Sequence, residues 1–233
     1  MHLLFLYARK VASLMDLQNV LLQISIWSVL LPLLVGVAFY RKLDRDSTLI
    51  FSLVFIASVP QLLSFLPISL HAINASYNIY TPVEFVVLYL LFSNKFTGSI
   101  YIQVLKVSGI IYVIVCLLFL FYYGISQKFI NELVCVNNLI YLLWMLLYIR
   151  KQFFQPDDDY SLQKPFFWYF TGLIIYAPCT MVVFALYYYL RQNSDYNLQN
   201  LWIIQSFCNT LMYVLFAIGL GKTRAPSKVN TTR

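Results

Sequence analysis

Glu84 is the residue of this chain with the clearest potential for chemistry. It is the one acidic residue inside an apolar stretch of membrane length, and it follows His71 in the segment LHAINASYNIYTPVEFVVLYLLF. An ionised carboxylate is costly within a bilayer, so such a residue marks a candidate functional site. A second interpretation is structural. Thr81-Pro82-Val83-Glu84 matches a capping box with proline at the first helical position, in which Glu84 would only cap a helix that begins near residue 79.

Other polar residues gather at the same end of the apolar segments as Glu84. A polar cavity that opens to the outside would explain this one-sided distribution, and it could hold a small molecule or a lipid. The alternative is that the amides only join helices by hydrogen bonds. The candidate cavity residues are Gln61, His71, Asn78, Tyr80, Glu84, Asn137, Asn138, Tyr176, Thr180, Gln205 and Asn209.

Known kinds of membrane enzyme need residues that this chain does not have. Hydrolases with paired intramembrane carboxylates are excluded because every aspartate lies outside the apolar segments, and a seven-helix metallohydrolase needs more histidines than His2 and His71. An acid–base pair of His71 and Glu84 has no recognisable nucleophile beside it. The four cysteines lie on four different segments without metal-ligand spacing. We therefore expect no enzyme activity, no catalytic residue, no metal and no cofactor.

The elements that carry these residues are long apolar segments. The chain is 61% hydrophobic and only 11% charged, with a mean hydropathy of +0.74, whereas a soluble domain carries about 25% charged residues. Runs of about 20 apolar residues predict helices that cross the bilayer, and their length excludes barrel strands. The fold class is therefore an all-α integral membrane bundle of seven helices, at 20–40, 48–66, 79–96, 102–123, 133–150, 166–190 and 201–220.

The basic residues predict the orientation of this bundle. Arg9, Lys10, Lys128 and Arg191 lie on the side of the N-terminus, and the other twelve of the 16 Lys and Arg lie on the opposite side. The positive-inside rule then places the N-terminus outside and the C-terminus in the cytoplasm. The net charge of +7 thus reflects topology in the plasma membrane, and no nucleic-acid partner is expected.

The parts outside the membrane are short. Residues 1–19 form an N-terminal segment, 20–221 a single transmembrane domain, and 222–233 a polar cytoplasmic tail; Met15 is an alternative start to Met1. The run Asp157-Asp158-Asp159 is best interpreted as a solvated loop. A signal would have to leave the bundle through a membrane or cytoplasmic partner, and the cations expected to form the docking face are Arg41, Lys42, Arg150 and Lys151.

Several stretches resemble a family of small seven-helix membrane proteins that are common in Bacteroidota. The resemblance rests on NIYTPVEFVVLYLLF, with Tyr80 and Glu84, on FFWYFTGLIIY, and on NLWIIQSFCNTLMYVLFAIGL, with Trp202 and Gln205. It extends over nearly the whole chain. The resemblance implies no defined activity. Members of the family are frequently found together with signalling proteins, and this association implies a sensory role. Members often carry histidine near the position of Gln205. This chain has glutamine there, and that departure from the family pattern weakens the case for a proton-linked role.

Three functions are compatible with the sequence. A sensor or receptor-like subunit would bind a ligand in the outer cavity and signal through a partner. A small-solute transporter would consist of three helices, a linker helix and three more, as Pro60 and Pro178 at matching places in two halves suggest. A structural or assembly subunit would pack against another membrane protein and need no polar cavity. We favour the sensor.

Overall fold

The computed structural model describes residues 19–64, 66–154, 161–193 and 195–223, and these residues form helices without any strand. A helix at residues 19–27 leads into the first labelled element. The labelled elements are α2 (Leu30–Ala38), η1 (Tyr40–Lys42), α3 (Arg45–Leu63), α4 (Leu70–Ser93), α5 (Ser99–Tyr123), α6 (Asn131–Phe154), α7 (Pro165–Asn193) and α8 (Asp195–Gly221). The N-terminal segment, the aspartate run and most of the C-terminal tail lie outside the described residues, so the predictions for them stay predictions.

Seven helical stretches in the described residues are long and apolar enough to cross a membrane. They include Asn19–Ala38, which joins the first helix to α2, and their length and composition indicate a multi-pass membrane protein. The prediction of an all-helical bundle with seven membrane-length helices is confirmed. The predicted orientation of the termini stays a prediction.

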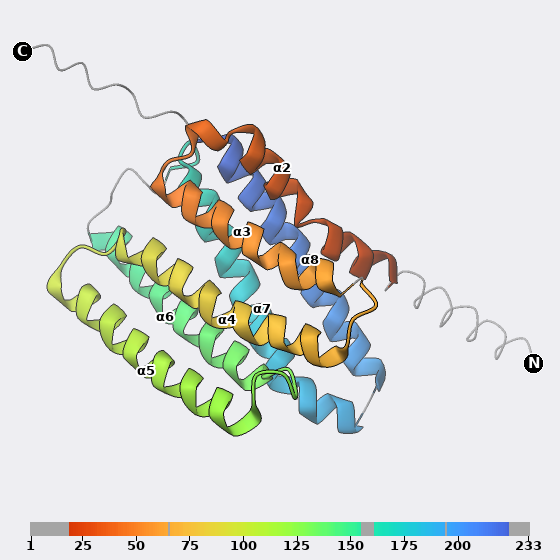
Figure 1. The fold of residues 1–233 in the computed structure, drawn as a ribbon. Helices are drawn as coiled ribbons and strands as arrows, with labels where there is room; N and C mark the ends of the chain where they lie inside the picture. The colour runs from red at the N-terminus through yellow and green to blue at the C-terminus, as the bar shows by residue number, and fades with distance from the viewer. Residues whose placement is uncertain (1–18, 65, 155–160, 194, 224–233) are drawn as a thin grey trace, which may run out of the picture.

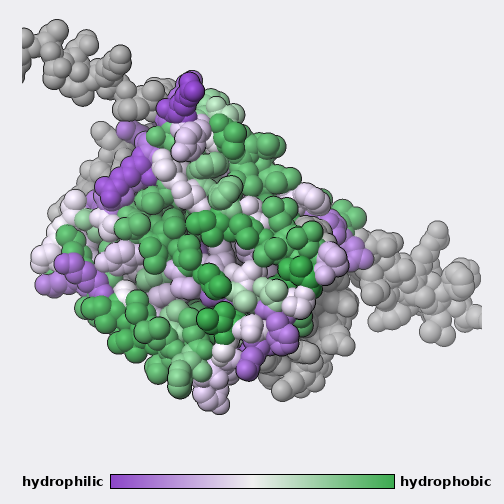
Figure 2. Space-filling view, viewed as in Figure 1, coloured by the Kyte–Doolittle hydropathy of each residue, from purple (hydrophilic) through white to green (hydrophobic). Residues whose placement is uncertain are grey.

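The helices pack into one bundle in which α7 lies along both α6 and α8 (Figure 1). On one side α2 packs on α8, and α3 packs on α4; on the other side α5 lies at the edge, against α6 and α4. The outer face of α5 is apolar and exposed, with Phe121 93% exposed. Hydrophobic side chains cover most of the face in Figure 2, and hydrophilic ones lie mainly toward its two ends. This distribution fits a bundle surrounded by lipid.

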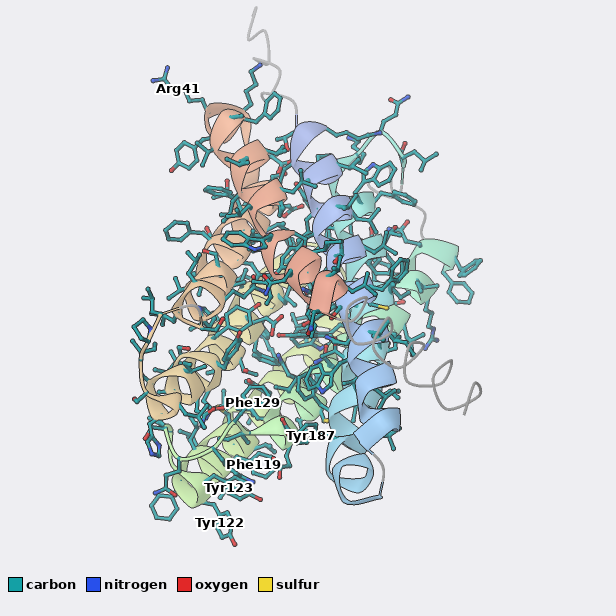
Figure 3. The ribbon with its side chains drawn as sticks, turned by 90° about the vertical axis from the view of Figure 1, so that its right-hand side faces the viewer. Arg41, Phe119, Tyr122, Tyr123, Phe129 and Tyr187 are labelled. Carbon is teal, nitrogen blue, oxygen red and sulfur yellow. The ribbon has the colours of Figure 1, made fainter. Side chains whose placement is uncertain are left out.

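The two ends of the bundle differ in character. The end where α2, α4, α6 and α8 finish, called the basic end here, carries Arg41, Lys42, Lys95, Arg150 and Lys151. The opposite end holds the loop 124–130, the ends of α3 and α7, and the starts of α4 and α8. In Figure 3, Arg41 marks the basic end, and Tyr122 and Tyr123 mark the opposite end.

Helix α4 begins nine residues earlier than the sequence pattern predicts. Ser69 is its N-cap, and the Ser69 hydroxyl accepts a hydrogen bond from the amide of Ala72 at 3.3 Å. Pro82 therefore lies inside the helix, where the Thr81 hydroxyl donates to the carbonyl of Tyr77 at 3.0 Å. The capping interpretation of Glu84 is wrong, because Glu84 lies well inside α4 and far from either helix end.

An aromatic cluster fills the bundle beside Glu84, between α4, α5 and α6. Trp144 is fully buried, and its indole nitrogen donates to the hydroxyl of Ser108 at 2.9 Å. Phe85 stacks on Tyr112 with ring centroids 3.7 Å apart, and Trp144 lies 5.2 Å from Phe85. These large contacts hold the three helices in fixed register, so the side chain that follows Glu84 is anchored in the core.

Buried polar contacts close the bundle at the basic end. The Tyr169 hydroxyl on α7 donates to Ser47 on α3 at 2.7 Å, and Ser47 is 3.0 Å from the hydroxyl of Thr223. Asp46 and Lys95 form an ion pair at 2.6 Å, with side chains 16% and 10% exposed. Between these contacts and the aromatic cluster lie large buried side chains, among them Tyr148, Phe170 and Phe216. The described residues toward the basic end thus include large buried rings and contacts between helices, and a hollow of about 210 Å³ lies at the end itself, lined by Asp44, Gln163, Lys164, Pro165 and Lys222.

Candidate functional site

A cavity of about 330 Å³ lies in the half of the bundle toward the opposite end, and Glu84 is one of its lining residues. Seven of the eleven candidates from the sequence line it, which places residues from α3, α4, α6, α7 and α8 around one space. These seven are Gln61, Tyr80, Glu84, Asn138, Tyr176, Gln205 and Asn209. The structure therefore brings most of the predicted set together, although the residues are spread over nearly 150 positions of the chain.

The Glu84 carboxylate is held by a neighbour on a different helix. The Asn137 side chain on α6 is fully buried, and its amide nitrogen donates to Glu84 Oε2 at 3.2 Å. Asn137 does not line the cavity itself but fixes the carboxylate that does. A neutral amide donor supports the carboxylate without balancing its charge.

Five tyrosines surround Glu84 within electrostatic range of its carboxylate. They come from α4, α5, α6, α7 and α8, so each of these five helices contributes one tyrosine hydroxyl to the surroundings of the carboxylate. The five are Tyr80, Tyr112, Tyr141, Tyr176 and Tyr213. No Lys, Arg or His stands among the described residues that line the cavity. The part of the lining that the structure describes therefore has one acidic group, many aromatic side chains and no basic group.

Further amides are fixed around the cavity by contacts between helices. Gln61 Nε2 donates to the Tyr213 hydroxyl at 3.2 Å, whereas Gln61 Oε1 is buried and has no hydrogen-bond partner among the described residues. Gln205 Nε2 donates to the Thr180 hydroxyl at 2.9 Å, which explains why Thr180 contributes to the site without lining it. Asn209 Nδ2 donates to the Ser25 hydroxyl at 2.9 Å and so ties α8 to the first span.

Asn138 differs from these because its amide bonds within its own helix. Its nitrogen donates to the carbonyl of Val134 at 2.8 Å, so this lining residue joins no second helix. The interpretation of such amides as links between helices therefore holds for four of them, namely Gln61, Asn137, Gln205 and Asn209. The two interpretations of the polar residues are compatible, since most of the amides that join helices also line the cavity.

A second hollow of about 680 Å³ lies toward the opposite end, among α4, the loop 124–130, α7 and α8. We call it the vestibule. It shares four lining residues with the cavity, namely Tyr77, Phe129, Phe184 and Trp202. Phe129 and Tyr187, both of which line the vestibule, lie toward the end of the bundle marked by Tyr122 in Figure 3. The cavity and the vestibule therefore adjoin at a common set of aromatic side chains.

These four shared side chains form a continuous row of ring contacts, called the aromatic row here. The centroids of Tyr77 and Phe129 are 5.8 Å apart, those of Phe129 and Phe184 are 5.5 Å apart, and those of Phe184 and Trp202 are 5.7 Å apart. The row lies where the polar cavity and the vestibule adjoin.

His71 and Asn78 do not line the cavity, so their assignment as cavity residues is not supported by their positions. His71 Nδ1 lies 3.0 Å from the carbonyl oxygen of Ser126. Asn78 donates to the carbonyls of Ile125 and Lys128 at 2.8 and 2.7 Å, and Asn78 Oδ1 accepts from the amide of Ile130 at 3.0 Å. Both side chains attach the loop 124–130 to α4.

Three of the four cations predicted to form the docking face at the basic end are exposed, and the fourth is buried. Arg41, Lys42 and Arg150 are exposed, and Arg41 extends from the end of the bundle in Figure 3. Lys151 is only 6% exposed, and its ammonium donates to the carbonyl of Lys95 at 2.7 Å. The inclusion of Lys151 in an exposed docking face is therefore wrong.

Several cavity residues were not among the candidates chosen from the sequence. They include Ser25, Thr81, Ser206 and Tyr213. Helical spacing could have identified two of them: Gln205, Asn209 and Tyr213 follow one another at four-residue intervals on α8, and Tyr77, Thr81 and Glu84 lie on one face of α4. Ser25 carries no such signal, because no other polar residue of the first span lines the cavity at helical spacing from it.

Comparison with known proteins identifies no relative. The chain matches no protein-family profile, and neither a curated protein nor a solved structure is significantly similar to it. The resemblance to the seven-helix proteins of Bacteroidota therefore stays a prediction, and the function has to be argued from the site.

Proposed function

We propose that this protein is a receptor-like subunit of the cytoplasmic membrane that binds a small molecule in the cavity beside Glu84. The observation that carries the proposal is the carboxylate itself, which lines a cavity of about 330 Å³ and is held by Asn137 without a basic partner in the lining. Cavities of this size are typical of small-molecule sites. A polar group placed at membrane depth is most readily explained by a ligand that uses it.

The vestibule provides a route for the ligand. It is lined by residues of the loop 124–130 and by the ends of α4, α7 and α8, so it lies at the surface end of the bundle. The aromatic row would then act as the entrance of the cavity. If the proposed orientation is correct, the ligand arrives from outside the cell.

The packing toward the basic end supports a receptor more than a transporter. A transporter must also open its site to the other side of the membrane. Here that path is filled by large buried rings, and α3, α7 and the end of α8 are joined by the contacts among Ser47, Tyr169 and Thr223. A purely structural subunit would have no use for a polar cavity with an acidic group.

The state of the cavity would reach a partner through the helices that line it. Helix α8 carries Gln205 and Asn209 at the cavity and ends at the basic end, and α6 carries Asn137 and ends at Phe154 beside the exposed Arg150. Arg41, Lys42 and Arg150 then offer cations for an acidic surface on a cytoplasmic partner.

The test is a screen of the purified protein in lipid nanodiscs. A chemically diverse panel of small molecules should contain compounds that raise the unfolding temperature of the wild-type protein. Ala57→Leu, which places bulk in the cavity lining, should abolish this stabilisation, whereas Val59→Leu on the exposed face of the same helix should not. Accumulation of the binding compound inside proteoliposomes, lost in Ala57→Leu, would instead identify a transporter.

A further inference from the structure

The charge of the cavity limits the chemistry of its ligand. Glu84 is the one carboxylate among the described residues that line it, and no Lys, Arg or His in that lining offers a counter-charge. A ligand that carries a carboxylate or phosphate would meet only an acidic group and neutral amides. A ligand that carries a positive charge would supply the partner that an ionised Glu84 lacks in the protein.

The hydrogen-bonding capacity of the cavity points in the same direction. Gln61 has its amide nitrogen engaged with the Tyr213 hydroxyl at 3.2 Å, which leaves the buried Oε1 atom as an acceptor without a partner among the described residues. Together with the carboxylate of Glu84, this oxygen forms a site that accepts hydrogen bonds. An ammonium group is a donor with several N–H bonds and no acceptor, so it complements such a site.

The walls of the cavity are aromatic. Tyr80, Tyr176 and Tyr213 line it together with Glu84, and the rings of the aromatic row line it where it adjoins the vestibule. Aromatic faces attract cations, especially when both are shielded from water. The same faces accept an apolar carbon skeleton, which an inorganic ion does not have.

We propose that the cavity is selective for organic ammonium ions, that is, small primary or secondary amines with an apolar body. The ammonium would lie between Glu84 and Gln61 Oε1, and the carbon skeleton would lie against the tyrosine rings. This inference rests on the proposed function, since it names the class of ligand for the same site. Lys128 at the vestibule does not oppose it, because Lys128 is paired with Glu132 at 3.5 Å.

The experiment compares amines with alcohols of the same carbon skeleton. Primary amines from butylamine to 2-phenylethylamine and the matching alcohols are titrated against the protein in nanodiscs. The best amine should bind about tenfold or more tightly than its alcohol, as expected when a charged group forms a hydrogen-bonded ion pair. Glu84→Gln, which preserves shape, should remove the difference between amine and alcohol. Asp44→Asn, at the basic end and outside both the cavity and the vestibule, is the matched control and should leave the difference intact.

Each other outcome has a defined meaning. If alcohols bind as tightly as amines, or if Glu84→Gln leaves the preference for amines unchanged, the amine inference is wrong while the cavity remains a ligand site. If neither class binds but neutral or anionic compounds stabilise the protein in an Ala57-dependent manner, the inference fails and the proposed function stands. If no compound binds, both fail. If sodium chloride alone gives the Glu84-dependent stabilisation, the site holds an inorganic cation and the inference is again wrong.

A second variant keeps the test valid if Glu84→Gln does not fold. Gln61→Met retains the length of the side chain and removes the acceptor oxygen. It should weaken the binding of the amine more than the binding of its alcohol. An equal loss for both would contradict the position assigned to the ammonium group.

Discussion

Replacement of Asn78 by alanine tests the account of the loop 124–130 most sharply. The Asn78 side chain is 1% exposed and makes three hydrogen bonds to this loop, two to carbonyl oxygens and one from the amide of Ile130. At roughly 0.6 to 1 kcal/mol for each bond, Asn78→Ala should lower the free energy of unfolding by about 2 to 3 kcal/mol. Asn78→Asp should be no more stable than Asn78→Ala, because it places a carboxylate oxygen against two carbonyl oxygens.

The measurement is an unfolding titration with sodium dodecyl sulfate in mixed micelles, combined with limited proteolysis of the loop. Ser76→Ala is the control, since the Ser76 hydroxyl bonds only to the carbonyl of Ile73 within α4. It should change the stability by less than about 0.5 kcal/mol. Suppose instead that Asn78→Ala keeps its stability and an intact loop but no longer binds ligand. Asn78 would then be a ligand residue, and our structural assignment would be refuted.

Three further predictions concern packing and access. Trp144→Phe removes the hydrogen bond to Ser108 and part of a fully buried ring, so the same titration should show a loss of about 2 kcal/mol. Gly219→Ala should lower the free energy of unfolding by about 1 to 3 kcal/mol, because the added Cβ would overlap a tyrosine ring and lie 3.1 Å from a backbone oxygen. Gly221→Ala, with space around the added Cβ, should leave the free energy of unfolding unchanged. Phe129→Ala interrupts the aromatic row, so it should raise the association rate of a cavity ligand more than its affinity, as measured by stopped flow. An unchanged rate would place the entrance elsewhere.

The helices could be predicted from the sequence because the membrane imposes their length and composition. Long apolar segments with polar ends have few alternatives to spanning helices. The start of α4 could not be predicted in this way. Its first turns contain His71, Asn74 and Asn78, which resemble a loop, and Pro82 resembles a helix start. What makes these turns helical includes a contact between Asn78 and a loop about fifty residues later in the chain.

The candidate site was predictable in part for a similar reason. A polar residue in an apolar helix needs a partner, so Gln61, Gln205 and Asn209 were recognisable as members of a buried cluster. Which residues face the cavity depends on the rotation of each helix, which a list of polar residues does not contain. Lys151 shows the same limit, since a lysine at a helix end reads as exposed although it turns back to the carbonyl of Lys95.

The central claim is that a small molecule binds beside Glu84. The most direct measurement is an experimental density map of the protein in nanodiscs with 2-phenylethylamine present, compared with a map of Glu84→Gln under the same conditions. We expect density for the amine between Glu84 and Gln61 in the wild-type map and none in the variant map. A cavity that holds only ordered water in both maps, or an acyl chain from the bilayer, would contradict the account.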